Sequence, residues 1–234
     1  MINNPKIIVA LDYDNAKEAS RFVSSIDPSL CKLKIGKQLF TNIGPEFVSS
    51  LVKKGFDVFL DLKFHDIPNT VAKAVSAASD LGVWMTNLHA SGGVKMMEDA
   101  KNVIEKNGSE MLLVAVTVLT SLGSKDLNDL GISVDVHEQV NRLTSLAKKA
   151  GMDGVVASAM EASELRDTHG EKFIIVTPGI RLDSTKFDDQ NRVVTPTQAI
   201  INGSDYLVIG RPITQALNPS DKLKYLNTEI LKIF

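Results

Sequence analysis

This chain of 234 residues has only one cysteine, and its formal net charge is small, at −2. A single thiol cannot form a disulfide within the chain, which excludes a small fold held together by disulfides. We expect Cys31, in an apolar strand-like segment, to be a buried structural side chain. Because neither basic nor acidic residues are in clear excess, we expect no nucleic-acid partner and a small-molecule ligand.

Long apolar runs are also missing. No stretch reaches the roughly 18 consecutive apolar residues of a membrane-spanning helix, so we expect no membrane association. The first residues, MINNPKIIVALD, lack the basic leader of a secretory signal peptide, and we expect a cytoplasmic protein. With 44% hydrophobic residues the chain can build a sizeable core, and we expect residues 1–234 to form a single domain.

Short β-branched runs alternate with amphipathic segments along the whole chain. This alternation is typical of a parallel sheet with helical crossovers. Eight strands are predicted, at residues 6–12, 31–36, 56–63, 83–90, 111–119, 154–159, 172–179 and 205–210. The count of eight, and the lack of a GxGxxG motif after the first strand, favour an α/β fold of the (β/α)8 TIM-barrel type over a doubly wound sheet.

Polar residues gather where the predicted strands end, which is where barrel enzymes place their chemistry. They are Asp12, Lys34, Asp61, Lys63, His89, Thr117, Thr120 and Arg211. Such a distribution predicts a functional site at the carboxyl end of the barrel.

The stretch DLKFHDIPNT, residues 61–70, holds the densest group of these charges. Strand alternation predicts that Asp61 and Lys63 share the inward face with Lys34, and that Asp66 adds a second carboxylate to form a tetrad of alternating sign. An ion-pair cluster that only lines the barrel mouth is the alternative, but clustered desolvated charges favour a site. A lysine between carboxylates keeps its proton, which suits a proton donor better than a Schiff-base nucleophile.

The loops after strands seven and eight, TPGIR and VIGRPIT, have the features of a phosphate site. Gly179 and Gly210 permit close backbone approach, and Arg181 and Arg211 supply planar donors. We expect Gln190, in the long polar loop between them, to close over the ligand. Either arginine alone would be read as a surface residue. No P-loop motif is present, which argues against a nucleotide hydrolase of that class.

The four histidines form no HExxH motif, and we predict no metal site. We expect them to have structural or supporting roles.

Several motifs occur in an order that resembles the orotidine 5′-phosphate decarboxylase family. DLKFHDIPNT is similar to that family's DxKxxD signature, and VALDYDNAKEA, KIGKQLFTNIGPEFV, VTVLTS, VTPGIR, DQNR and YLVIGRPIT also match. The resemblance covers nearly the whole chain. It implies decarboxylation of orotidine 5′-phosphate to UMP and carbon dioxide, the last step of de novo UMP synthesis, without a cofactor or metal.

The resemblance also implies roles for individual residues. Lys63 would deliver the proton to C6, Asp61 would lie against the departing carboxylate, and Lys34 would hold the charges and contact the ribose. The other substrate-binding positions it implies are Asp12 for a ribose hydroxyl, Thr120 for the pyrimidine edge, Pro178 in the same pocket, and Arg181, Gln190, Gly210 and Arg211 for the phosphate. It further implies a homodimer with shared active sites, in which Asp66, Ile67 and Thr70 reach into the neighbour's site.

Two alternatives remain open. One is a magnesium-dependent relative, such as 3-keto-L-gulonate 6-phosphate decarboxylase or hexulose-phosphate synthase, which shares DxKxxD. The resemblance implies an acidic residue late in strand two of those enzymes, where this chain has Lys34. A barrel that only binds a phosphorylated ligand is the other alternative, and it would leave Lys63 without a role.

Overall fold

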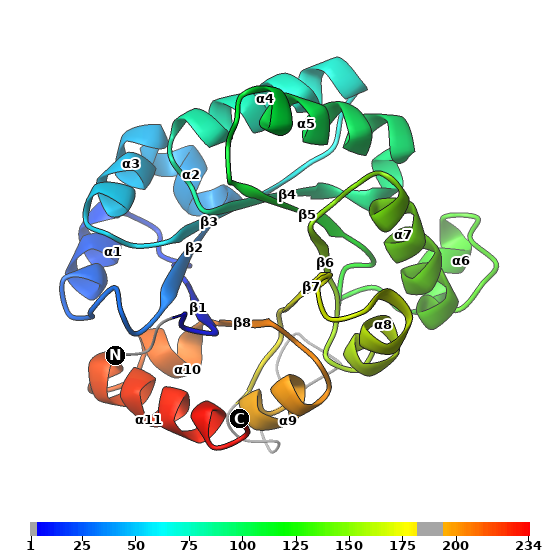
Figure 1. Ribbon diagram of the computed structural model, residues 1–234. Coiled ribbons are helices and arrows are strands. Elements are labelled where there is room, and N and C mark those ends of the chain that lie inside the picture. Colours follow the sequence, from blue (N-terminus) through cyan, green and yellow to red (C-terminus); the bar gives the residue numbers. More distant parts are fainter. Residues whose placement is uncertain (1–3, 182–193) are drawn as a thin grey trace.

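The computed structural model describes residues 4–181 and 194–234, and their eight parallel strands close into a barrel in sequence order (Figure 1). The predicted (β/α)8 fold is confirmed, and each strand begins within two residues of its predicted start. The strands are β1 (Ile7–Ala10), β2 (Lys32–Gly36), β3 (Val58–Phe64), β4 (Met85–His89), β5 (Leu112–Val116), β6 (Gly154–Val156), β7 (Ile174–Thr177) and β8 (Tyr206–Ile209).

Helices surround the barrel and connect successive strands (Figure 1). They are α1 (Ala16–Val23), α2 (Lys37–Ile43), α3 (Pro45–Lys53), α4 (Pro68–Asp80), α5 (Val94–Lys106), α6 (Ser124–Asp129), α7 (Val136–Lys149), α8 (Ala162–His169), α9 (Pro196–Ile201), α10 (Arg211–Thr214) and α11 (Pro219–Leu231), with a short 3₁₀ turn, η1 (Ala90–Gly92), after β4. Local sequence explains their starts. Asn15 caps α1 by accepting the backbone N–H of Glu18 at 3.0 Å, and Pro68 occupies the first turn of α4, as predicted.

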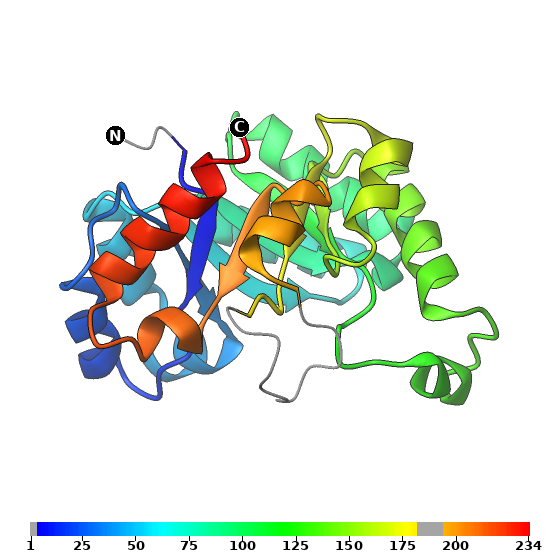
Figure 2. The ribbon, with the colours of Figure 1, turned by 90° about the horizontal axis from the view of Figure 1, so that it is seen from below.

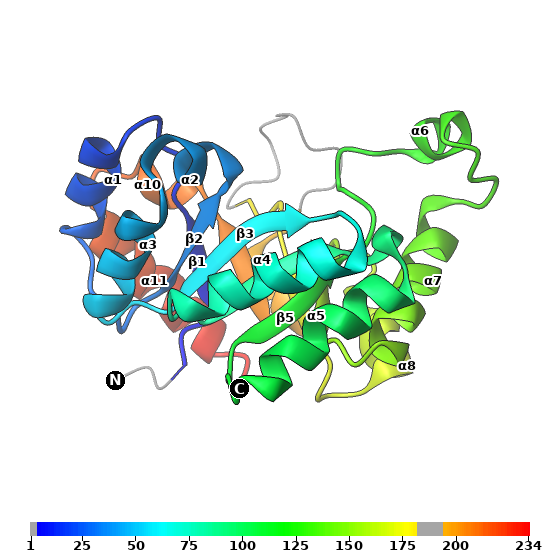
Figure 3. The same ribbon diagram turned by 90° about the horizontal axis from the view of Figure 1, so that it is seen from above.

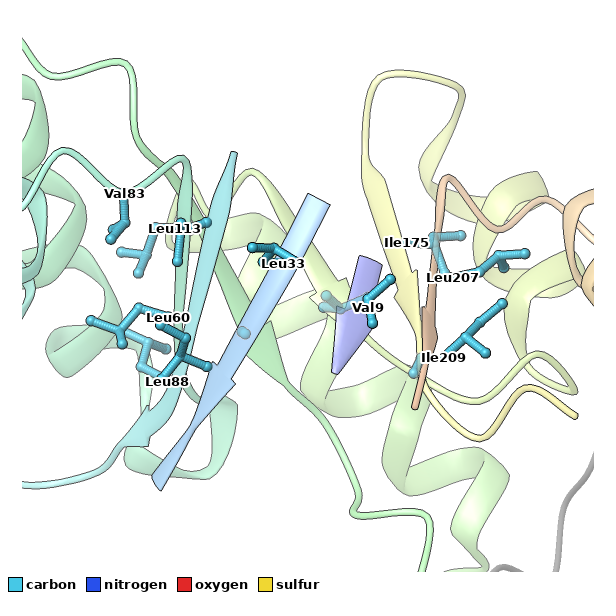
Figure 4. Packing of buried hydrophobic residues seen from close by; sticks show 14 of the residues in the cluster. Val9, Leu33, Leu60, Val83, Leu88, Leu113, Ile175, Leu207 and Ile209 are labelled. Atoms are coloured by element: carbon cyan, nitrogen blue, oxygen red, sulfur yellow. The ribbon is translucent and has the colours of Figure 1, made fainter. Parts of the chain in front are cut away.

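The core has two layers, because consecutive strand residues point to opposite sides of the barrel wall. A small cluster that includes Phe59 and Val114 fills the barrel interior. A larger cluster lies between the barrel and the helices, and Figure 4 shows part of it, with Leu60 and Leu88 on neighbouring strands. The predicted inward direction of Phe59 and outward direction of Leu60 are therefore confirmed.

The two ends of the barrel differ. Helices α2 and α10 follow their strands directly at the carboxyl end, and the C-terminus of the chain lies at the opposite end (Figures 2 and 3). At that opposite end the ammonium group of Lys32 pairs with Asp57 at 2.5 Å and lies 4.3 Å from the Trp84 ring centroid. This buried ammonium group helps to close the amino end, because Asp57 neutralises its charge and the ring of Trp84 packs against it.

Cys31 is fully buried, as expected, and burial raises the pKa of its thiol to about 12. The thiol is therefore chemically inert in the folded protein. Among the residues that the structure describes, no helix is long and apolar enough to cross a membrane.

Candidate active site

Four charged side chains form a line of alternating sign at the carboxyl ends of the first three strands. The ammonium group of Lys34 on β2 lies 3.4 Å from Asp12 Oδ1, just after β1, and 3.4 Å from Asp61 Oδ2 on β3. The other carboxylate oxygen of Asp61, Oδ1, lies 2.5 Å from Lys63 Nζ. The arrangement therefore runs Asp12, Lys34, Asp61, Lys63, with each cation next to a carboxylate.

Asp61 is the buried centre of this line, with 7% of its surface exposed. Burial by itself would raise the pKa of the Asp61 carboxyl group. The positive charges of Lys34 and Lys63 and the hydrogen bonds from Lys63 and Asn87 together outweigh burial, so the pKa lies below its ordinary value. Asp61 is thus a fixed negative charge at neutral pH, held in a water-poor environment where its field on a ligand is strong.

The strand that carries Asp61 and Lys63 is irregular at this point. The pairing of β3 with β4 shifts between Leu60 and Phe64, which is the mark of a β-bulge. Within the bulge Lys63 has φ +51°, and no other non-glycine residue of the described chain has a positive φ. This left-handed conformation is costly for a residue with a side chain, and it commonly marks functional sites.

Asn87 on β4 was not among the sequence-predicted site residues. It is fully buried, donates from Nδ2 to Asp61 Oδ1 at 2.7 Å, and accepts the backbone N–H of Lys63 at 2.8 Å. A signal was present in the sequence, because an amide two residues before His89 in an apolar strand shares the inward face of that strand.

The prediction that Asp66 of the same chain completes the tetrad is wrong for a single chain. Asp66 is exposed, and its carboxylate accepts the backbone N–H of Ile67 at 2.6 Å. The chain turns away from the barrel after Phe64 to enter α4, which carries Asp66 outward. Asp12 takes the place of the second carboxylate. Ile67, 66% exposed, and Thr70 also face outward.

His89 ends β4, as predicted, and its ring centroid lies 5.5 Å from that of His65. Burial lowers the pKa of the His89 imidazole to about 4, and electrostatic interaction with His65, Lys37 and Lys63 acts in the same direction. His89 is therefore neutral at physiological pH. Within the described ranges, no three or more His, Cys, Asp or Glu side chains are grouped closely enough to hold a metal ion, and metal independence stays a prediction.

An apolar cavity of about 190 Å³ lies beside the two lysines. Its wall combines the charges of Lys34, Asp61 and Lys63 with Phe59, Val116, Val118, Leu119, Thr120, Val156, Ala157, Pro178 and Val208. The predicted residues Thr120 and Pro178 are thus brought to the same cavity as Lys63. A flat, weakly polar ring would find apolar walls there and charged groups at one edge.

A second cavity of about 420 Å³ joins the same region to the phosphate-type loops. Its lining residues include Asp12, Lys34, Thr120, Pro178, Gly179, Arg181, Gly210 and Arg211. The structure therefore brings both predicted arginines to a cavity that Lys34 also lines. Gln190 lies outside the described residues.

Comparison with known proteins identifies close relatives. The model of the orotidine 5′-phosphate decarboxylase / HUMPS family matches residues 5–226. The chain is 58% identical over 231 residues to the orotidine 5′-phosphate decarboxylase of Tolumonas auensis, covering 98% of this chain and 100% of that protein. It is 59% identical over 226 residues to the protein of the same name from Haemophilus influenzae, with 96% and 98% covered. It also superposes on the crystal structure of orotidine 5′-phosphate decarboxylase from Lactobacillus acidophilus, with a TM-score of 0.87, 36% identity, and 97% and 99% of the two chains covered.

Proposed function

Because the chain belongs to the orotidine 5′-phosphate decarboxylase / HUMPS family, we propose that it converts orotidine 5′-phosphate to UMP and carbon dioxide, without a metal or cofactor. Its class is then that of a carboxy-lyase of pyrimidine biosynthesis. The observation that carries the proposal is the charged line Asp12, Lys34, Asp61, Lys63 beside an apolar cavity.

The proposed chemistry uses Lys63 as the proton donor. When the bond between C6 and the carboxylate breaks, carbon dioxide leaves and the electron pair stays on C6. The ammonium group of Lys63 first stabilises that negative charge and then transfers a proton to C6, and solvent restores the proton on Lys63. Fixed ammonium groups in a dry cavity stabilise a carbanion better than water does, because they need no reorganisation during the reaction.

Asp61 and Lys34 complete the reacting region in this proposal. Asp61 lies against the departing carboxylate, and its two oxygens hold the ammonium groups of Lys63 and Lys34 in place. Lys34 and Asp12 bind the ribose, which is supported by the cavity that both of them line with Arg211. Thr120 and Pro178 bind the pyrimidine, which is supported by their place on the wall of the apolar cavity.

We assign the 5′-phosphate to Arg181, Gly210 and Arg211, with Gln190 closing over it. The two arginines line the same cavity as Lys34, so a ligand held by its phosphate would reach the charged line. Binding energy gained at the phosphate, remote from C6, can then stabilise a closed site that excludes water.

The exposed positions of Asp66, Ile67 and Thr70 support a homodimer with shared active sites. A side chain such as Ile67, which is two-thirds exposed, gains by burial against a second copy. In a two-fold dimer each copy would offer the same segment to the other, and Asp66 would then add its carboxylate to the partner's charged line. We also propose a cytoplasmic location, where nucleotide synthesis takes place.

Magnesium-dependent sugar-phosphate relatives are the second candidate, since they share the DxKxxD pattern that this chain has at residues 61–66. Lys34 argues against them, because its ammonium group lies where a divalent cation would need a carboxylate ligand, and positive charges repel.

The deciding experiment follows the ultraviolet absorbance of orotidine 5′-phosphate with the purified protein in EDTA, with Lys63→Ala as control. Rapid loss with the wild type alone is the expected result. No loss with folded wild type, together with magnesium-dependent turnover of 3-keto-L-gulonate 6-phosphate, would overturn the proposal.

A further inference from the structure

We propose that Asn87 is a positioning residue, which holds both the carboxylate of Asp61 and the left-handed backbone of Lys63 in the geometry required for turnover. The inference rests on the proposed function, because its readout is decarboxylation. It assigns a role to a residue that carries no charge and lies at the base of the charged line.

The first step is the double hydrogen bond. The amide of Asn87 uses both of its ends on neighbouring parts of β3, donating to Asp61 Oδ1 at 2.7 Å and accepting the Lys63 backbone N–H at 2.8 Å. The side chain is fully buried, so removing the amide takes a hydrogen-bond partner from a carboxylate and from a backbone N–H where water is scarce, which is costly. One planar group thus fixes the orientation of a carboxylate and the position of a backbone segment together.

The second step is the irregular strand. Regular pairing ends at Leu60 with Thr86 and resumes at Phe64 with Leu88, so β3 advances by four residues where β4 advances by two. The backbone of Lys63 therefore lacks a regular partner on β4, and the side chain of Asn87 supplies the acceptor. This bond helps to offset the cost of φ +51° at Lys63.

The third step is the direction of the Lys63 side chain. A left-handed residue sends its side chain in a direction that a regular strand does not allow. Loss of the Asn87 acceptor would let Lys63 relax toward an ordinary strand conformation, and loss of the donor would let the Asp61 carboxylate rotate. Either movement displaces the ammonium group that the proposed mechanism uses.

The charged and titratable groups near position 87 come from the first four strands of the barrel. Asp61 and Lys63 come from β3, Lys34 from β2, Asp12 follows β1, and His89 lies further along β4. On the other side, Asn87 pairs with the apolar Val114 of β5.

The test compares Asn87→Ala, Asn87→Asp and a matched control, Thr86→Val. Thr86 is the adjacent residue on β4, equally buried, and its hydroxyl donates to the Leu60 carbonyl at 2.8 Å on the same strand pair. The control therefore removes one β3 to β4 hydrogen bond without touching Asp61 or Lys63. For all proteins kcat and KM for orotidine 5′-phosphate are measured from pH 5.5 to 8, with the unfolding midpoint and UMP affinity.

Asn87→Ala is expected to lower kcat by about 100-fold at every pH, as for displacement of a catalytic group by roughly 1 Å, with UMP affinity within about threefold of wild type. Thr86→Val is expected to keep kcat within about threefold while losing similar stability. Asn87→Asp places a second carboxyl group beside Asp61, and two such groups retain a proton more readily than one. The kcat of Asn87→Asp relative to wild type is expected to rise about tenfold or more as pH falls, because the protonated carboxyl group again donates to Asp61. Above its pKa, a fall of roughly one pH unit raises the protonated fraction of the group about tenfold.

The inference is overturned if Asn87→Ala keeps kcat within fivefold of wild type, if Thr86→Val loses as much kcat at equal stability, or if the relative kcat of Asn87→Asp does not rise at low pH. Inactive wild type would instead refute the proposed function, so the two failures are distinguishable.

Discussion

Asp61 and Lys63, two residues apart on β3, form an ion pair with 2.5 Å between Oδ1 and Nζ. The other oxygen of Asp61 faces Lys34 at 3.4 Å, so one buried carboxylate holds two ammonium groups on opposite sides. This relationship separates the roles of the charged residues, because Lys63 can be removed while Lys34 and Asp61 keep their own pair.

Lys63→Ala is expected to lower kcat by about 1,000-fold or more, because general acid catalysis by a positioned side chain contributes on this scale. Affinity for UMP is expected to stay within a few fold, which steady-state kinetics and calorimetry with the same preparation can check. Lys95→Ala, which removes an exposed lysine of α5, is the matched control and is expected to leave both unchanged. A Lys63→Ala protein with kcat near that of wild type would place the proton donor elsewhere.

Arg211→Ala is expected to act mainly on KM. Loss of a charge-assisted hydrogen bond to phosphate weakens binding by about 10- to 100-fold, while kcat at saturation stays within a few fold. Arg211→Lys, which keeps the charge but not the planar donors, is expected to fall between the two. Equal changes in kcat and KM for Lys63→Ala and Arg211→Ala would contradict this division of roles.

Shared sites in a homodimer predict complementation between two inactive variants. In a hybrid of a Lys63→Ala chain and an Asp66→Ala chain, one site receives both intact residues and the other receives neither. Random mixing of equal amounts after dissociation is expected to restore about a quarter of wild-type activity, because half of the dimers are hybrids with one working site.

Each variant treated alone in the same way is the control and is expected to remain inactive. If hybrids are demonstrated by mass and activity does not return, Asp66 does not serve the partner's site.

His89 predicts a specific pH dependence of stability. The pKa of His89 is about 4 in the folded protein, below its ordinary 6.5, so between these values the unfolded chain binds a proton that the folded chain does not. Stability from this group is therefore present above pH 6.5 and is lost as pH falls toward 4.

His89→Asn is expected to lose less stability than wild type between pH 7 and pH 4.5, measured as the free energy of unfolding in urea. His137→Asn, which changes an exposed histidine of α7, is the control. It is expected to follow wild type more closely, because the exposed pair of His137 with Glu164 contributes little to stability. A constant difference between wild type and His89→Asn across this range would show that His89 titrates at its ordinary pKa.

Much of the fold could be predicted from sequence, because each strand must bury a run such as that around Val9 or Leu207, and each helix has an apolar stripe and local start signals. The positions of Lys34, Asp61 and Lys63 at strand ends followed from the same periodicity. The site could be predicted only in part, because periodicity describes a regular strand and the pairing of β3 with β4 is not regular.

The sequence by itself determined the eight strand and helix repeats and the inward faces of β2 and β3, since both depend on residues close together in the chain. Tertiary structure alone decided that Asp12 rather than Asp66 lies beside Lys34, that Lys63 adopts a left-handed conformation, and that the amide of Asn87 supports it. The physical reason is that these features depend on the register between neighbouring strands and on the direction in which the chain leaves the barrel. Both are set by packing between segments far apart in the sequence.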